Sequence, residues 1–146
     1  MKAMQALEQT IDQAMQLKLR SKDAIIHFEE GLIGFSEFKD FVLMENDGIA
    51  PFRLLQSVES PEVGFLVLDP RTLVPNYLDL VPRREWDSLG NGSKATPLAF
   101  VICVIGSTPQ TSTGNFQAPL LINYESMTGK QVILTDSGLS VRHALL

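Results

Sequence analysis

Among the side chains of this 146-residue chain that could take part in catalysis, carboxylates are the most numerous. Glu29 and Glu30 precede a glycine-rich turn, and Asp69 precedes Pro70. A small hydrolase or isomerase that uses the carboxylates around Glu29 and Asp69 is one hypothesis, and it needs two close carboxylates with different pKa values. Adjacent residues of a strand point to opposite faces, so Glu29 and Glu30 do not form such a pair by themselves. We interpret them as a solvent-exposed charged run.

Histidine and cysteine offer little further chemistry. His27 and His143 are the two histidines, and Cys103 lies inside an apolar run. Metal ligation needs such residues clustered at fixed spacing, so we expect no metal site. Cys103 is interpreted as a core residue, because a reactive thiolate needs a polar, electropositive setting. The segment Gly90–Lys94 lacks the residue order of a phosphate-binding loop. We expect no cofactor and no catalysis.

Charge is unevenly distributed along the chain. The net charge of −5 argues against direct binding of nucleic acid, which needs a basic face. From residue 23 to residue 69 there are ten acidic and two basic residues, a formal charge of −8 that leaves +3 for the remainder. If these strands share a face, they form a negative surface that attracts a basic partner; the alternative is that the acids only keep the protein soluble. The acidic residues are Asp23, Glu29, Glu30, Glu37, Asp40, Glu45, Asp47, Glu59, Glu62 and Asp69.

Composition favours one globular domain in a reducing compartment. Apolar residues make up 45% of the chain and charged residues 20%, as in ordinary globular domains. The single cysteine excludes an intrachain disulfide. The sequence has no stretch approaching about 20 apolar residues, the length of a membrane-spanning helix. Glu8 and Asp12 interrupt any apolar segment near the start, so we expect no secretion signal and a cytoplasmic location.

The first residues have the pattern of an amphipathic helix. Met4, Leu7, Ile11 and Met15 recur at spacings of three and four, which predicts a helix over residues 3–17. Because such a helix is marginal alone in water, it must dock, either on its own domain or as a lid or partner contact. We treat residues 1–18 as an extension and residues 19–146 as the domain.

The domain has the pattern of a β-rich fold. One short internal helix is expected near Pro82–Leu89, where proline can begin the first turn. The apolar run Leu98–Ile105 is typical of a strand buried on both faces. Gly31 and Gly34 predict a shaped turn, and Thr128–Lys130 is interpreted as another turn. The expected fold is mostly β, a compact antiparallel barrel or sandwich of about six to eight strands. The strand candidates are 24–28, 41–45, 52–57, 64–68, 97–106, 119–123 and 131–134.

Several motifs in a fixed order resemble the FliW family of flagellar assembly factors over roughly residues 19–146. Ile33 stands where that family commonly has proline, and the helix of residues 3–17 lies outside the usual match. The motifs are FEEGLIGF at 28–35, PFRLLQS at 51–57, FLVLDP at 65–70, Tyr77, the strand through Val104, NFQAPLLIN at 115–123, GKQVIL at 129–134 and VRH at 141–143.

The resemblance implies a small β-rich adaptor with two protein partners. One is flagellin, held before export; the other is CsrA, a dimeric RNA-binding regulator that blocks translation of the flagellin message. In the family scheme FliW inhibits CsrA until flagellin occupies FliW. The alternative among binding functions is a flagellin chaperone without CsrA regulation.

Candidate partner-binding residues combine the carboxylates with aromatic and neighbouring side chains. Aromatic residues bordered by charge are typical anchors of protein interfaces. We expect Phe52, Leu55 and Phe116 to line a groove that receives an amphipathic flagellin helix. The full set is Glu29, Glu30, Phe35, Phe52, Leu55, Gln56, Asp69, Tyr77 and Phe116.

Overall fold

The computed structural model describes residues 5–6, 8–10, 25–89 and 98–145. In this part of the chain no helix is long and apolar enough to cross a membrane. Helix α2 (Arg83–Asp87) confirms the helix expected near Pro82–Leu89. The strands are β1 (Ile26–Phe28), β2 (Asp40–Met44), β3 (Arg53–Ser57), β4 (Gly64–Leu68), β5 (Leu98–Val104), β6 (Thr113–Gly114), β7 (Leu120–Asn123), β8 (Thr128–Gln131) and β9 (His143–Ala144).

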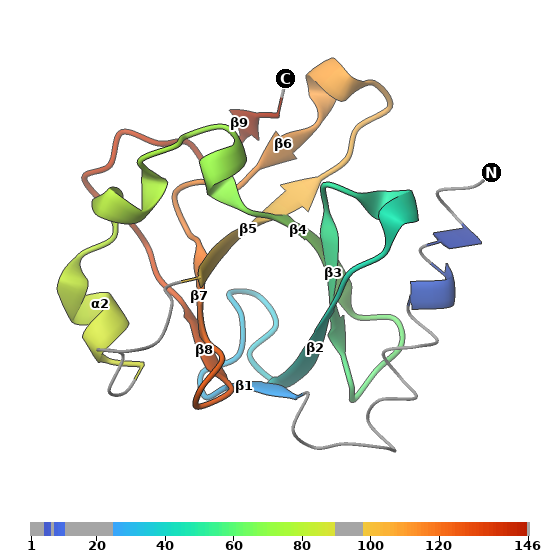
Figure 1. Ribbon diagram of the computed structural model, residues 1–146, viewed down its shortest axis with the longest axis horizontal. Helices are drawn as coiled ribbons and strands as arrows, with labels where there is room; N and C mark the ends of the chain where they lie inside the picture. The colour runs from blue at the N-terminus through green and yellow to red at the C-terminus, as the bar shows by residue number, and fades with distance from the viewer. Residues whose placement is uncertain (1–4, 7, 11–24, 90–97, 146) are drawn as a thin grey trace.

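Seven strands close into a barrel, which Figure 1 shows as a ring. The order β4-β3-β2-β1-β8-β7-β5 is closed by pairing of β4 with β5. The β-rich barrel is confirmed, but the sheet is mixed: β1 and β8 are parallel, and the other pairs are antiparallel. The expected antiparallel arrangement thus holds for every pair of the described strands except β1 with β8. The two strands are far apart in sequence, so no hairpin fixes their relative direction.

The barrel interior is an apolar core. Alternate residues of each strand point inward, as the pleat requires. The rings of Phe28 and Phe41 meet edge to face with centroids 5.6 Å apart. The fully buried members of this inner core include Ile26, Phe28, Leu32, Phe41, Leu55, Val67, Phe100, Leu120 and Ile122.

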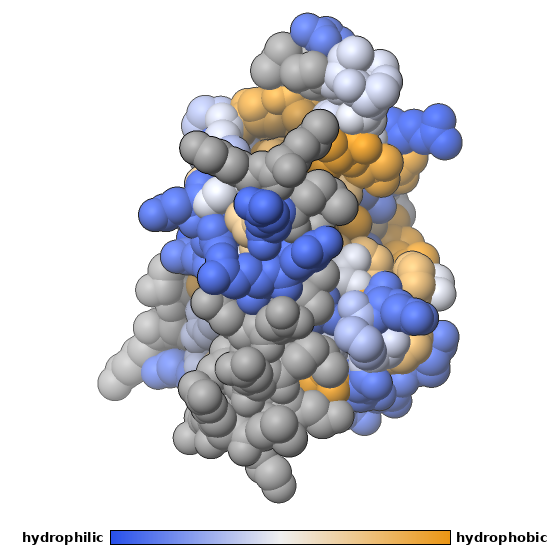
Figure 2. All heavy atoms as spheres, turned by 90° about the vertical axis from the view of Figure 1, so that its right-hand side faces the viewer, coloured by the Kyte–Doolittle hydropathy of each residue, from blue (hydrophilic) through white to orange (hydrophobic). Residues whose placement is uncertain are grey.

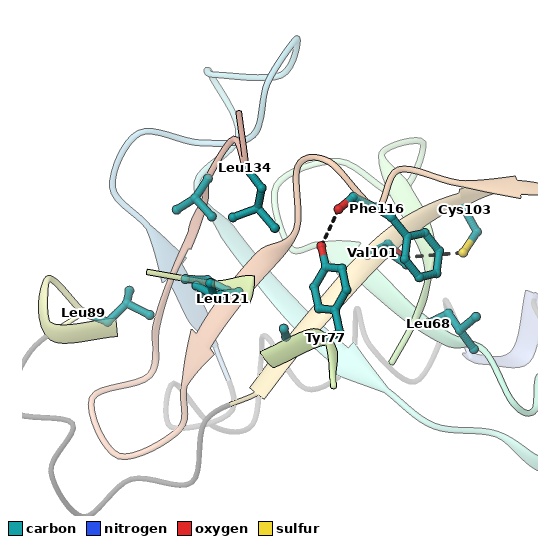
Figure 3. Packing of buried hydrophobic residues seen from close by; sticks show 11 residues of the cluster. Leu68, Tyr77, Leu89, Val101, Cys103, Phe116, Leu121 and Leu134 are labelled. Carbon is teal, nitrogen blue, oxygen red and sulfur yellow. Dashed lines mark hydrogen bonds between the residues drawn. The ribbon is translucent and has the colours of Figure 1, made fainter. Parts of the chain in front are cut away.

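A second core lies against the outer side of β4, β5 and β7. It is covered by α2 and by the 3-10 turns η3 (Pro70–Thr72) and η4 (Tyr77–Leu80). Tyr77 and Phe116 form its centre, as Figure 3 shows. The outer core includes Leu68, Tyr77, Val81, Leu89, Val101, Cys103, Phe116, Leu121, Val132 and Leu134.

Strand β5 separates the two cores. Phe100 belongs to the inner core, while Val101 and Cys103 belong to the outer core. This confirms the strand predicted to be buried on both faces. It also confirms Cys103 as a core residue, and burial raises the pKa of its thiol to about 12.

The hairpin between β7 and β8 differs from the sequence expectation. The sequence predicts a turn at Thr128–Lys130, but these residues belong to β8, and the turn lies at residues 124–127. Asn123 makes this turn by accepting hydrogen bonds from the backbone N–H groups of Glu125 and Ser126. Position 129 requires glycine for packing and not for a turn, because a Cβ there would come 2.5 Å from the Phe28 ring.

The N-terminal helix is described only in part. Residues 5–6 and 8–10 are helical, and Thr10 is fully buried. Ala6 lies against Gly48 of η2 (Asp47–Ile49), so close that a Cβ at Gly48 would meet the Ala6 Cβ. In Figure 1 this segment, in dark blue, lies outside the ring of strands. The remaining residues of the predicted helix, and the Gly90–Lys94 loop, lie outside the described part of the chain.

Candidate partner-binding surface

The topology gathers acidic residues at one end of the barrel. Strand β1 ends, β2 begins, β3 ends and β4 begins at this same end, because these four strands alternate in direction. Residues 29–40, which run to the first residue of β2, and residues 59–63 between β3 and β4 lie there, and together they carry six carboxylates and one lysine, a formal charge of −5. We call these residues the acidic end. The carboxylates are those of Glu29, Glu30, Glu37, Asp40, Glu59 and Glu62.

The remaining acids of the predicted stretch lie elsewhere. Glu45, Asp47 and Asp69 belong to the opposite end of the barrel, where β2 and β4 finish. Two of them have ion-pair partners there: Glu45 pairs with Arg53 at 2.9 Å, and Asp69 pairs with Arg71 at 2.7 Å. Asp23 lies outside the described residues. The negative surface is thus concentrated at one end and built from six of the ten acids.

The connection from β1 to β2 lies across the mouth of the barrel at this end. In Figure 1 it is the light-blue loop that crosses the middle of the ring. Gly31 and Gly34 both have positive φ, +67° and +86°, as the predicted shaped turn requires. Between them Leu32 is 1% exposed and packs into the inner core, whereas Ile33 is 60% exposed. The turn therefore plugs the barrel and presents an isoleucine to solvent.

A groove of about 920 Å³ runs beside this turn. Three separate parts of the chain form its walls: the turn after β1, the helix α2 with Leu89, and β8 with the residues that follow it. Its charged lining is Glu29, Glu30, Glu85 and Lys130, with His27 beside Glu29, and its exposed apolar side chains are Ile33 and Ile133, the latter 57% exposed. Apolar side chains bordered by carboxylates are suited to a basic, amphipathic protein segment.

His27 connects two acids at the entrance of the groove. Its Nδ1 lies 2.8 Å from Asp40 Oδ1, and its Nε2 lies 2.8 Å from Glu29 Oε2. The hydrogen bonds to Asp40 and then to Glu29 raise the pKa of His27 above its usual value, since both carboxylates favour the imidazolium form. The histidine holds Glu29 in place and neutralises part of the local charge.

Two further contacts fix the walls of the groove. Lys130 Nζ reaches Glu85 Oε1 at 3.0 Å and Ser88 Oγ at 2.5 Å, which ties α2 to β8. The Gln131 side chain accepts a hydrogen bond from Ile33 N–H at 2.8 Å and donates one to the Ala118 carbonyl at 3.0 Å. The turn, the helix and the strand are therefore held at fixed positions around the groove.

Asp69 does not join the acids of the groove. It caps η3 by accepting a hydrogen bond from Arg71 N–H, at the end of the barrel opposite Glu29. Burial alone would raise its pKa, but the side-chain and backbone hydrogen bonds from Arg71 hold the pKa below its usual value. Glu29 and Asp69 thus do not form a catalytic pair. Within the described residues no cluster of three or more His, Cys, Asp or Glu side chains could hold a metal ion.

The predicted apolar groove of Phe52, Leu55 and Phe116 does not form. Leu55 is 1% exposed inside the barrel, whereas Phe116 is fully buried in the outer core with Phe52 packed against it. The sequence shows that these residues are apolar, but it does not show which core receives each of them. A role for them in partner binding stays a prediction.

The other predicted site residues also differ in exposure. Tyr77 and Gln56 are fully buried, and Phe35 is 38% exposed with its ring 5.1 Å from that of Phe65. Gln56 donates hydrogen bonds to the carbonyls of Ser57, Ser60 and Val63, and so shapes the turn between β3 and β4. Among the predicted residues the structure brings Glu29 and Glu30 together in the groove.

Sequence reasoning missed four residues of the groove. Glu85, Lys130, Gln131 and Ile133 come from α2 and from the strand region beyond Gly129. Each is unremarkable within its own segment. They meet Glu29 and Glu30 only because β8 pairs in parallel with β1, which no local pattern indicates.

Comparisons with known proteins agree with this architecture. Residues 10–145 match the model of the family described as FliW protein. A flagellar assembly factor FliW of Leptospira interrogans is 37% identical over 127 residues, covering 86% of this chain and 85% of that protein. One of Caldanaerobacter subterraneus subsp. tengcongensis is 33% identical, covering 86% and 85%. A crystal structure of the flagellar assembly factor FliW matches with a TM-score of 0.77 at 34% identity, covering 86% of this chain and 88% of that chain. This chain therefore belongs to the FliW family of flagellar assembly factors.

Proposed function

We propose that this protein is a non-enzymatic, cytoplasmic adaptor that binds flagellin and antagonises a CsrA-type RNA-binding regulator. In this proposal the free adaptor holds the regulator away from the flagellin message. Accumulating flagellin then occupies the adaptor and releases the regulator, so that flagellin level controls flagellin translation. The family membership makes flagellin the expected partner, and the acidic end carries the proposal for the regulator.

The acidic end supports binding of an RNA-binding partner. A protein that binds RNA must present basic residues to phosphate. The acidic end has a formal charge of −5 over two adjoining connections, and it adjoins a groove with exposed isoleucines. A basic partner would be attracted to this end, and bound carboxylates would repel RNA from it. Antagonism thus follows from charge, even where the adaptor does not cover the RNA site.

A segment without charged side chains supports binding of flagellin. It includes the last part of β5, which runs toward the end of the barrel where β4 begins. Beyond the barrel, the end of β5 pairs with β6, which pairs with β9. Val104 is 66% exposed and Ile105 is 48% exposed at this end of β5, and residues 98–123 contain no charged side chain. Figure 2 shows hydrophobic side chains gathered in the upper part of the molecule. An uncharged apolar surface suits the apolar stripe of an unassembled flagellin helix better than it suits a basic regulator.

A crossover of variants tests the two assignments together. We expect the triple charge reversal Glu30→Lys, Glu37→Lys and Glu62→Lys to weaken binding of the regulator and to leave flagellin binding unchanged. Val104→Asp should do the opposite. Isothermal titration calorimetry with each purified partner measures both affinities. If both variants affect both partners equally, or neither partner, the two-surface assignment is wrong.

Glu125→Lys is the matched control for the charge reversal. Glu125 is exposed in the turn between β7 and β8, at the end opposite the acidic end. The substitution Glu125→Lys changes the net charge by the same amount as each single reversal at the acidic end. A loss of regulator binding in Glu125→Lys as large as that of one acidic-end reversal would mean that net charge, and not the acidic end, decides affinity.

A further inference from the structure

The groove contains an open strand edge. In an antiparallel pair the hydrogen bonds of successive residues alternate between the two sides of the strand. Val132 N–H donates to the Pro119 carbonyl and Leu134 N–H donates to the Gln117 carbonyl, so these two residues bond toward β7. The backbone groups of Gln131 and Ile133 therefore face the other side, toward β1.

Strand β1 ends before it reaches these groups. Its last residue, Phe28, pairs with Gly129, and the chain then turns away at Gly31, whose N–H donates back to the Phe28 carbonyl. Within the described residues no strand continues the pairing along Gln131–Ile133. Strand β8 therefore extends beyond the last residue of β1, its neighbour in Figure 1.

The lining of the groove agrees with this geometry. A strand that presents its face to a groove contributes alternate residues, because side chains alternate between faces. Here Gln131, Val132 and Ile133, three consecutive residues beyond the last position paired with β1, all line the groove. The strand therefore presents its edge, with backbone N–H and carbonyl groups, to the open space.

The walls on either side indicate what the edge would accept. Glu29 and Glu30 stand on the opposite wall, and Ile33 and Ile133 supply exposed apolar surface. The Gln131 side chain bonds to Ile33 N–H and keeps that wall at a fixed distance. An extended segment that paired with the edge would place alternate side chains toward the two sides, and basic residues would complement the carboxylates.

We infer that this groove binds an extended segment of a basic partner protein, which adds a strand to β8 along Gln131–Ile133. Main-chain hydrogen bonds hold the segment, and Glu29 and Glu30 select basic side chains on it. This mode differs from docking of a helix, which leaves the edge unpaired. The inference rests on the proposed function for its partner, the CsrA-type regulator.

Amide-resolved hydrogen exchange tests the inference. The probe is the purified CsrA-type regulator, added in excess to the full-length, ¹⁵N-labelled adaptor. We expect the Gln131 and Ile133 amides to exchange freely in the adaptor alone and at least roughly tenfold more slowly in the complex, as amides of a paired strand do. The Val132 and Leu134 amides, already bonded to β7, are the internal reference.

A pair of variants at one position separates the main chain from the side chain. Ile133→Pro removes the groove-facing N–H, while Ile133→Ala keeps it and removes the apolar side chain. We expect proline to weaken regulator binding roughly tenfold more than alanine, about the effect of one lost hydrogen bond. Thermal unfolding of both variants checks that they fold. If the proline variant does not fold, the exchange experiment on the unmodified protein tests the inference instead.

The outcomes distinguish this inference from the proposed function. Binding of the regulator with unchanged Gln131 and Ile133 exchange overturns strand addition alone. Absence of regulator binding overturns the proposed partner and the inference with it. Slowed exchange of the same amides when the adaptor alone is concentrated would show that a second copy occupies the edge, which also contradicts the assignment to a basic partner.

Discussion

The Tyr77 hydroxyl donates a buried hydrogen bond of 2.5 Å to the backbone carbonyl of Phe116, and the two rings meet edge to face with centroids 5.7 Å apart. This contact joins η4 to the segment between β6 and β7 (Figure 3). On its other side Phe116 stacks on His143 of β9 at 4.4 Å. A single aromatic stack thus connects the covering turns, the barrel and the end of the chain.

Tyr77→Phe tests the hydrogen bond without changing the packing of the rings. The Phe116 carbonyl would remain buried without its donor, which costs about 1–3 kcal/mol of unfolding free energy. Urea denaturation measures the loss. The control is Tyr124→Phe, at a side chain that is 43% exposed, where the change should stay within about 0.5 kcal/mol. Equal losses in the two variants would contradict a special role for Tyr77.

Gly31→Ala and Gly34→Ala form a matched pair at the turn that plugs the barrel. Both glycines have positive φ, so alanine costs each about 1–2 kcal/mol of unfolding free energy. At Gly31 a Cβ would also lie 2.7 Å from the Ser36 backbone, whereas at Gly34 nothing lies within 4 Å. We therefore expect Gly31→Ala to lower the free energy of unfolding more than Gly34→Ala. The opposite order would mean that the turn adapts to a side chain at Gly31.

The pH dependence of stability tests the contacts of His27. Its pKa is raised in the folded protein by Asp40 and Glu29, so the folded state binds the proton more tightly than the unfolded state. The stabilising contribution is full below the unfolded pKa of about 6.5 and is lost as the pH rises through the higher folded pKa. We expect the stability difference between the natural protein and His27→Gln to shrink over that window. A difference that grows with pH would contradict the assigned contacts, and NMR titration of the imidazole gives the folded pKa directly.

Thiol reactivity tests the burial of Cys103. Its pKa of about 12 keeps the thiol protonated at neutral pH, and the outer core covers it. A thiol-specific chromogenic reagent at pH 8 should react with the native protein at the slow rate set by opening of the structure, and at once in denaturant. Rapid reaction of the native protein would show that the outer core opens at Cys103.

Local patterns predicted the features that depend on local chemistry. The glycines of the β1–β2 turn, the short helix α2 and the double burial of β5 all follow from spacing and residue type. The prediction of a turn at Thr128–Lys130 is wrong, because Asn123 makes the turn and Gly129 gives space to Phe28 within β8.

The site depended on pairing between distant segments. The sequence predicts a negative surface only on the condition that the early strands share a face. The directions of these strands place six of the acidic residues at one end of the barrel. The assignment of Leu55 to the inner core and Phe116 to the outer core could not be read from alternation, because both environments are apolar. The open edge at Gln131–Ile133 exists because β1 ends at Phe28, a difference in length between two strands about 100 residues apart.

Release of RNA from the CsrA-type regulator tests the proposed partner switch most directly. Fluorescence anisotropy of labelled flagellin leader RNA bound to the regulator is followed as the adaptor is added, and purified flagellin is added afterwards. We expect the adaptor to release the RNA and flagellin to restore RNA binding to the regulator. RNA that stays bound at saturating adaptor would contradict antagonism and leave flagellin chaperoning as the function.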